Sequence, residues 1–179
     1  NGSGGVSDDC IMNDKGSDGF DNLVIDGCTI TNYGTTIYLE TNSNDINITN
    51  NQLHATGSVS LQIKGHRNYI AHNNITRNMQ DFTGSTGHKI INNTILTTGA
   101  IIVRGNDYFI TNNTVLKIMV YDNAYRHNIT WNNVTGTGIA IDLADTYLSR
   151  IQDNTVSSGY MELDTVKTSN ITRNTIIKS

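Results

Sequence analysis

One short pattern recurs along the whole chain and limits the folds that it can adopt. The pattern I-x-x-N-x-[IVL] occurs eight times, beginning at Ile25, Ile48, Ile70, Ile90, Ile110, Ile129, Ile151 and Ile171. Successive copies start 19 to 23 residues apart. A period of this length is typical of solenoids, in which each copy forms one unit that stacks on the next.

A second apolar segment follows most copies of the pattern. It spans residues 34–40, 57–64, 99–104, 117–121, 138–143 and 159–164. Each repeat therefore holds at least two short strands and a corner, and about 20 residues at about 3.3 Å each return to a stacked position only by winding around a core. We predict one all-β domain, a right-handed parallel β-helix over residues 21–179 with about eight complete coils of about 21 residues. Residues 1–20 are expected to form an N-terminal cap or an opening coil.

Composition supports strands and turns over helices. The chain has 25 Asn, 24 Thr and 23 Ile but nine Leu and no Pro. Ile and Thr suit a pleated, half-buried surface, and Asn tolerates the left-handed backbone of a sharp corner. The Asn of the pattern recurs in seven of the eight copies, with Cys28 in the first. We expect these residues to form a ladder, because stacked amides can donate to and accept from one another.

The leucine-rich repeat is the competing solenoid, since its motif contains the same core. Two residues before each first Ile, however, the chain has mostly polar or aromatic residues where that motif requires leucine: Leu23, Ile46, Asn68, His88, Tyr108, His127, Ser149 and Ser169. The second half of each repeat is also β-branched and punctuated by Gly rather than helical. These features favour the β-helix.

Charge and hydropathy exclude several classes of partner. The net charge of −4 gives no basic field for a phosphate backbone, so we expect no nucleic-acid partner. No apolar run approaches 18 residues, which argues against membrane insertion. Neither the two cysteines nor the five histidines show the spacing of metal ligands, and we expect no metal or other cofactor. The histidines are expected at the surface or at corners.

Alternation along the second strand of each coil predicts which residues face outward. Ile37 and Leu39 should lie inside, as should their counterparts in other coils. The outward strip should hold Asp9, Tyr38, Glu40, Gln62, Lys64, Ile102, Arg104, Met119, Tyr121, Asp142, Glu162 and Asp164. Such a mixture of carboxylates, bases and aromatics is typical of a groove that binds sugars, and a solvated sheet face is the alternative.

The coil pattern resembles the pectate-lyase-like β-helix superfamily. Within it, residues 8–11 (DDCI), 28–34 (CTITNYG) and 62–64 (QIK) resemble, in order, the DDC, C…GHG and RIK blocks of polygalacturonase-type glycoside hydrolases. The resemblance implies that Asp8 and Asp9 act on the glycosidic bond and the attacking water, and that Lys64 holds a uronate carboxylate. Tyr33 and Gln62 stand where that family has His and Arg, so the implied site is incomplete. The family also implies a disulfide between Cys10 and Cys28, with two free thiols as the alternative.

Three functions follow from these features. The first is an extracellular or surface-associated module that binds or processes polysaccharide, with Asp8, Asp9 and Lys64 as catalytic candidates and Tyr33, Tyr38, Glu40, Gln62, Arg104 and Tyr121 as substrate-binding candidates. The second is a non-catalytic element of a phage tailspike, adhesin or surface layer, which would include the virion surface as a location. The third is a uronate lyase that uses Lys64 and Arg104 as base and cation. Open strand edges at the ends of a solenoid also predict a homotrimer or end-to-end self-association.

Overall fold

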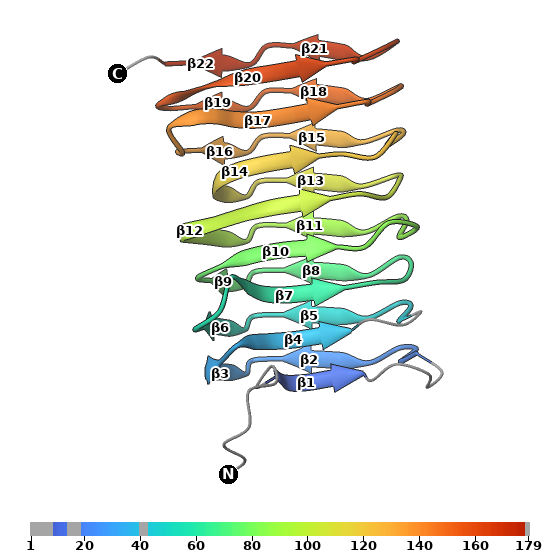
Figure 1. Cartoon of the computed structure of the whole chain (residues 1–179), viewed down its shortest axis with the longest axis vertical. Coiled ribbons are helices and arrows are strands. Elements are labelled where there is room, and N and C mark those ends of the chain that lie inside the picture. Colours follow the sequence, from blue (N-terminus) through green and yellow to red (C-terminus); the bar gives the residue numbers. More distant parts are fainter. Residues whose placement is uncertain (1–8, 14–18, 40–42, 178–179) are drawn as a thin grey trace.

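The computed structural model of the chain describes residues 9–13, 19–39 and 43–177. These residues form a parallel β-solenoid of about 7 turns, built from 22 strands (Figure 1). The part of the chain that is described holds no helix, so no helix in it could cross a membrane. The leucine-rich alternative, which requires a helix or 3₁₀ segment in each repeat, is therefore excluded.

Each coil contributes one short strand to each of three faces. The first face is an eight-stranded parallel sheet of β2 (Val24–Asp26), β5 (Asn47–Thr49), β8 (Tyr69–Ala71), β11 (Lys89–Ile91), β13 (Phe109–Thr111), β15 (Asn128–Thr130), β18 (Arg150–Gln152) and β21 (Asn170–Thr172). Its central residues are the first Ile of each sequence repeat, paired in register from coil to coil. Eight stacked strands are separated by about seven turns, one fewer than the eight complete coils that the sequence predicts.

The second and third faces form one 14-stranded sheet, because two long strands continue around the bend between them. The second face holds β3 (Thr29–Tyr33), β6 (Gln52–Ala55), β9 (Asn74–Ile75), the first part of β12 (Thr94–Val103) and of β14 (Thr114–Val120), β16 (Asn133–Val134), β19 (Thr155–Val156) and β22 (Thr175–Ile176). The third face holds β1 (Asp9–Asn13), β4 (Thr35–Leu39), β7 (Val59–Ile63), β10 (Asn78–Asp81), the second part of β12 and of β14, β17 (Gly138–Ala144) and β20 (Gly159–Asp164). Strand β1 falls within the opening segment and pairs in parallel with β4.

The predicted Asn ladder lies at the corner between the first and second faces. Each member from Asn51 to Asn154 donates from Nδ2 to Oδ1 of the Asn in the next coil. Asn113 is representative: Nδ2 donates to Asn132 Oδ1 at 3.0 Å and to the carbonyl oxygen of Ile90 at 2.9 Å. The ladder begins at Cys28, whose backbone N–H donates to Asn51 Oδ1 at 2.9 Å. The ladder thus satisfies buried polar groups coil after coil.

The core is a set of stacked apolar columns that contains one carboxyl group. Inward residues of the third face are fully buried, as predicted for Leu39 and Ile63. Asp81 occupies the equivalent place on β10 and is 2% exposed. Its oxygens accept hydrogen bonds from the Arg104 backbone N–H at 2.7 Å and from the Tyr108 hydroxyl. Burial raises the pKa of Asp81 to about 7, because removal from water disfavours the charged form.

The corner between the third and first faces contains a buried aromatic column. The Tyr108 ring lies between the rings of His88 and His127, at centroid distances of 5.0 Å and 5.5 Å. Both histidines lie at a corner, one of the two expected places, but they are buried there rather than exposed. Burial lowers the pKa of His88 to about 3 and that of His127 to about 4, so both imidazoles are neutral at pH 7.

The least regular coil predicted from the sequence, residues 78–87, keeps its strand but shifts in register. The pairing of β10 with β7 is irregular between Asn78 and Met79. A second shift, which the sequence pattern does not indicate, lies between Ile95 and Ala100, where Thr97 has a φ of 78°. Both shifts occur at the bend into the third face, and both adjoin the groove described below.

Candidate functional site

The outward side of the third face carries two rows of side chains. The first row is in register from coil to coil and holds Met12, Tyr38, Gln62, Gln80, Ile102, Met119, Asp142 and Glu162. The predicted outward residues of this row are confirmed, with one exception. The exception is Asp9, which pairs with Thr35 and so lies outside this row; Met12 takes the place beside Tyr38.

The second row lies two residues further along each strand, at its end or just beyond it. It includes Lys64, Phe82, Arg104 and Tyr121, each of them half-buried. The Phe82 ring contacts Tyr38 edge to face, at a centroid distance of 6.3 Å. Aromatic rings and long polar side chains therefore alternate over neighbouring coils of this face.

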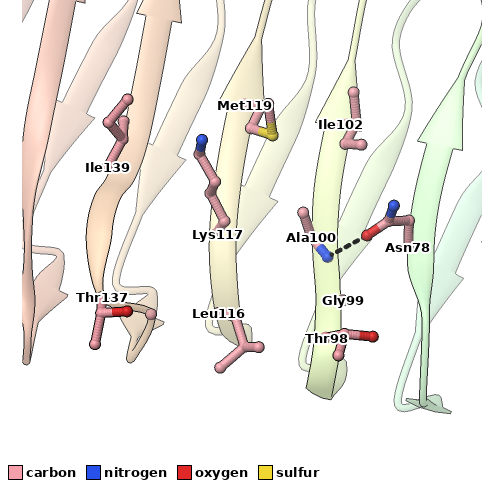
Figure 2. Close-up of a pocket in the computed structure, with 11 residues that line it drawn as sticks. Asn78, Thr98, Gly99, Ala100, Ile102, Leu116, Lys117, Met119, Thr137 and Ile139 are labelled. Atoms are coloured by element: carbon pink, nitrogen blue, oxygen red, sulfur yellow. Dashed lines mark hydrogen bonds between the residues drawn. The ribbon is translucent and has the colours of Figure 1, made fainter. Parts of the chain in front are cut away.

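A groove of about 490 Å³ lies where the second face bends into the third (Figure 2). It crosses β10, β12, β14 and β17 and is lined by Asn78, Thr98, Gly99, Ala100, Ile102, Leu116, Lys117, Met119, Gly136, Thr137 and Ile139. Its volume falls within the range of about 300–1,000 Å³ that is usual for small-molecule sites. The lining combines apolar side chains with polar ones, and Lys117 is its charged member.

Glycine is required where the backbones approach each other beneath the groove. A Cβ atom on Gly136 would lie 2.2 Å from the carbonyl oxygen of Leu116. A Cβ atom on Gly99 would lie 2.7 Å from the carbonyl oxygen of Arg77. Asn78 Oδ1 accepts a hydrogen bond from the Ala100 backbone N–H at 2.9 Å and so ties β10 to β12 (Figure 2). The shape of the groove is thus set by the main chain as well as by side chains.

A charged cluster borders the groove and comprises Arg104, Lys117, Tyr121, Asp122 and Asp142. The Tyr121 hydroxyl donates to Asp142 Oδ2 at 2.9 Å, and Lys117 Nζ lies 3.7 Å from the same oxygen. Arg104 Nε lies 3.6 Å from Asp122 Oδ2. Burial, and next the hydrogen bond to Asp142, raise the pKa of Tyr121 to about 12. The hydroxyl therefore stays protonated and acts as a donor that fixes the carboxylate.

The predicted catalytic residues are not brought together. Asp8 lies outside the described residues, as does the side chain of Asp9. Asp9 of β1 pairs with Thr35 of β4, and Lys64 follows the end of β7, two coils from β1. Along the strand direction, the two residues are five positions apart in the register of the sheet. At about 3.3 Å per residue and 4.8 Å per coil, the separation of their backbones is roughly 19 Å. Their backbones thus lie well apart, and the catalytic roles that the resemblance implies for Asp8, Asp9 and Lys64 stay a prediction.

The predicted substrate-binding residues divide into two groups. Tyr38, Gln62, Arg104 and Tyr121 face outward on the third face, as expected. Tyr33 is the last residue of β3 on the second face and is 37% exposed, so it lies apart from them. Glu40 lies outside the described residues. Lys64 and Arg104 are two coils apart, or about 10 Å, as the sequence spacing predicts for the lyase hypothesis.

Cys28 is a free cysteine whose Sγ lies 3.5 Å from the carbonyl oxygen of Asp26. This differs from the disulfide that the resemblance implies between Cys28 and Cys10. The free Cys28 agrees with the alternative of free thiols, and the side chain of Cys10 lies outside the described residues. Within those residues no group of three or more His, Cys, Asp or Glu could hold a metal ion.

Sequence reasoning missed the residues that shape the groove. Lys117, Asn78 and Ile139 were not among the outward residues predicted, although Lys117 is two residues from Met119 and shares its face. Alternation extended backward along β14 would have found it. Register shifts hid the other two, because simple alternation fails at Asn78 of β10 and at Ile139 of β17.

No family model matches this chain, and no curated protein matches it. The pectate-lyase-like resemblance therefore rests on the coil pattern alone, and the polygalacturonase resemblance on the short sequence blocks alone. What the structure itself supports is the parallel β-solenoid with its Asn ladder.

Proposed function

We propose that the chain is an extracellular module that binds polysaccharide in the groove of the third face. The observation that carries this proposal is that outward apolar side chains in the groove lie beside a hydrogen-bonded polar cluster. Ile102 and Met119 face outward in the groove, and the Tyr121–Asp142–Lys117 contacts lie along its border. Saccharide sites combine these two features, since a sugar ring has apolar C–H faces and a rim of hydroxyl groups.

The direction of the groove also suits a linear chain. In the first row, Gln62 and Gln80 present hydrogen-bonding groups on one side of Ile102 and Met119, and Asp142 does so on the other side. Tyr38 and Phe82 lie beside the two glutamines. Coils about 4.8 Å apart offer a repeated set of contacts along the solenoid. A polymer would therefore be held at several positions, which adds affinity through modest individual contacts.

A second candidate function is hydrolysis of the bound chain. The register places Asp142 of β17 directly beside Glu162 of β20, with both side chains facing outward. Adjacent parallel strands are about 4.8 Å apart, and retaining glycosidases hold their two carboxyl groups about 5–5.5 Å apart. This pair, rather than Asp8 and Asp9, is the arrangement that favours a hydrolase.

The test is a binding screen of the purified chain against acidic and neutral polysaccharides. Bound glycan is measured by isothermal titration calorimetry or affinity electrophoresis, and new reducing ends and the ultraviolet absorbance of unsaturated uronates are recorded in the same samples. Lys117→Ala should weaken binding by roughly tenfold, a loss of about 1.4 kcal/mol. Lys89→Ala is the matched control, because Lys89 is an exposed lysine on the first face and far from the groove.

The outcomes separate the candidate functions. Binding that Lys117→Ala weakens and Lys89→Ala does not supports the groove. New reducing ends that disappear in both Asp142→Asn and Glu162→Gln support hydrolysis in addition. Absence of binding across the panel, or equal loss in both lysine variants, refutes the proposal and leaves a structural solenoid.

A further inference from the structure

The corner between the first and second faces, which the groove does not reach, carries one large exposed aromatic side chain. Trp131 is the only tryptophan of the chain and is 61% exposed. It lies between β15 and β16, immediately before the ladder residue Asn132. Its side chain therefore contributes little to the core, and burial does not explain its presence.

The backbone at Trp131 makes the residue more unusual. Its φ is 61°, a left-handed conformation that is costly for a bulky residue with a Cβ atom. The equivalent positions of other coils are Gly27, Asn50, His72, Asn92, Asn112, Asp153 and Arg173. Glycine or a polar residue thus serves at this corner elsewhere. An exposed Trp held in a strained conformation is a marker of function rather than of stability.

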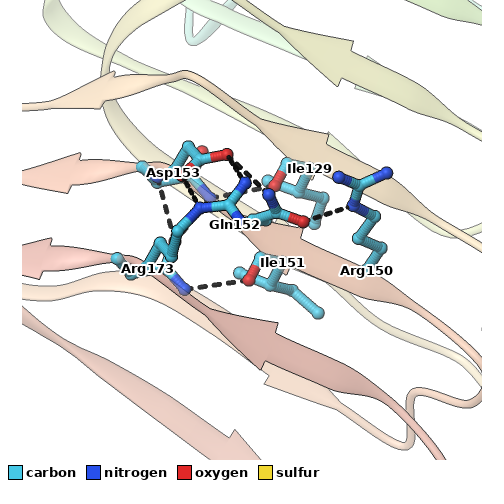
Figure 3. A network of polar contacts seen from close by, with 8 residues as sticks. Ile129, Arg150, Ile151, Gln152, Asp153 and Arg173 are labelled. Atoms are coloured by element: carbon cyan, nitrogen blue, oxygen red, sulfur yellow. Dashed lines mark hydrogen bonds and ion pairs between the residues drawn. The ribbon is translucent and has the colours of Figure 1, made fainter.

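A preorganised polar network lies in the next coils (Figure 3). Asp153 occupies the place of Trp131 one coil on, and both of its oxygens accept from Arg173, at 2.7 Å and 2.8 Å. Gln152 Nε2 donates to Asp153 at 2.7 Å, and Gln152 Oε1 accepts from Arg150 Nε at 2.6 Å. Trp131 is joined to the network by its backbone N–H, which donates to the Gln152 carbonyl oxygen at 3.2 Å.

The charge of this network favours an anionic ligand. Arg150 and Arg173 are both exposed, and Asp153 is the one carboxylate between them, so the network carries a formal charge of +1. Arg150 uses Nε within the network, and its two Nη groups make no hydrogen bond to the described residues (Figure 3). A guanidinium in this position can donate two hydrogen bonds to a carboxylate or a sulfate group.

We propose that Trp131, with Arg150 and the Asp153–Arg173 pair, forms a second saccharide site that stacks an anionic sugar ring on the indole. The indole supplies a flat apolar surface, and the arginines supply donors to the acidic substituent. The site uses a different corner of the coil from the groove and does not depend on the groove binding sugar.

Because Trp131 is the only tryptophan, its fluorescence reports directly on this site. The full chain is titrated with a carboxylated probe (oligogalacturonate), a sulfated probe (chondroitin sulfate oligosaccharide) and a neutral probe (maltohexaose). We expect a saturable change in emission with one or both acidic probes and none with the neutral one. Arg150→Gln should raise the dissociation constant by roughly tenfold, because a charge-assisted donor is lost.

Two further variants keep the test decisive. Trp131→Asn should fold and melt at a temperature no lower than that of the parent chain, since Asn tolerates the left-handed backbone, yet should lose acidic-probe binding at this corner by calorimetry. Lys117→Ala in the groove should leave the Trp131 emission change intact. An emission change that neutral and acidic probes share, one that Arg150→Gln leaves unaltered, or no change with any probe overturns the inference.

Discussion

Removal of one amide from the middle of the Asn ladder should destabilise the whole solenoid. In Asn113→Ala, the backbone N–H and the Nδ2 group of Asn93 lose the oxygen that accepts from them at 2.9 Å and 3.1 Å. The carbonyl oxygen of Ile90 loses its donor as well. Asn93 Nδ2 keeps its hydrogen bond to the carbonyl oxygen of Ile70, so two groups are left to count. A buried polar group without a partner costs about 1–3 kcal/mol, so the two give at least about 2 kcal/mol. That is a large share of the roughly 5–15 kcal/mol that stabilises a typical domain.

Urea unfolding, followed by circular dichroism, measures this loss. The matched control is Asn112→Gly, which removes the neighbouring exposed amide and keeps a residue that adopts its φ of 56°. We expect the control to change the free energy of unfolding by less than about 1 kcal/mol. A loss of less than about 1 kcal/mol in Asn113→Ala itself would show that the ladder amides do not satisfy buried polar groups.

Two further predictions concern the core. The pKa values of His88 and His127 are lowered to about 3 and 4, so the unfolded chain binds more protons below its own histidine pKa of about 6.5, and stability should fall as pH drops from 6.5 toward 4. The pKa of Asp81 is raised to about 7, so between pH 4 and 6.5 the folded chain holds one proton there that the unfolded chain has lost. This offsets one of the two extra protons that the unfolded chain binds at the histidines. With about one net proton taken up on unfolding, the free energy of unfolding should fall by about 1 kcal/mol per pH unit toward acid. A flat or rising profile toward acid would contradict this assignment. Gly105→Ala should cost more than about 2 kcal/mol, because its Cβ would lie 1.8 Å from a main-chain oxygen, whereas Gly27→Ala, with no atom within 4 Å, should cost about 1 kcal/mol for its left-handed backbone. Similar melting temperatures for these two variants would show that the close approach at Gly105 is absent.

The fold could be predicted because the same physical problem recurs in every coil. Every coil must fill the core and satisfy the buried polar groups of its corner. An inward Ile and a corner Asn do this in nearly every coil, so the pattern is visible in a single sequence. The opposite corner has no such repetition. Its inward position is filled by Asn68, His88, Tyr108 and His127 in successive coils, and a position that changes chemistry at every step gives no periodic signal.

The site was predicted only where strict alternation holds. Tyr38, Gln62 and Asp142 lie on strands, Tyr121 directly follows β14, and all four face outward as the alternation of side chains predicts. Asp9 lies in an opening segment with no copy of the repeat, so nothing in the sequence fixes its register. Buried Asp81 could have been found, because alternation from Met79 already places it in an inward apolar column. A carboxyl group at such a position is unusual and would have marked the residue.

The most direct test of the account is a crystal structure of the chain bound to the tightest oligosaccharide from the binding screen. We expect sugar rings over Ile102 and Met119, with hydroxyl groups within hydrogen-bond distance of Asp142, Tyr121 or Lys117. An oligosaccharide that occupies only other surfaces, with the groove filled by solvent, would contradict the proposal that this face recognises polysaccharide.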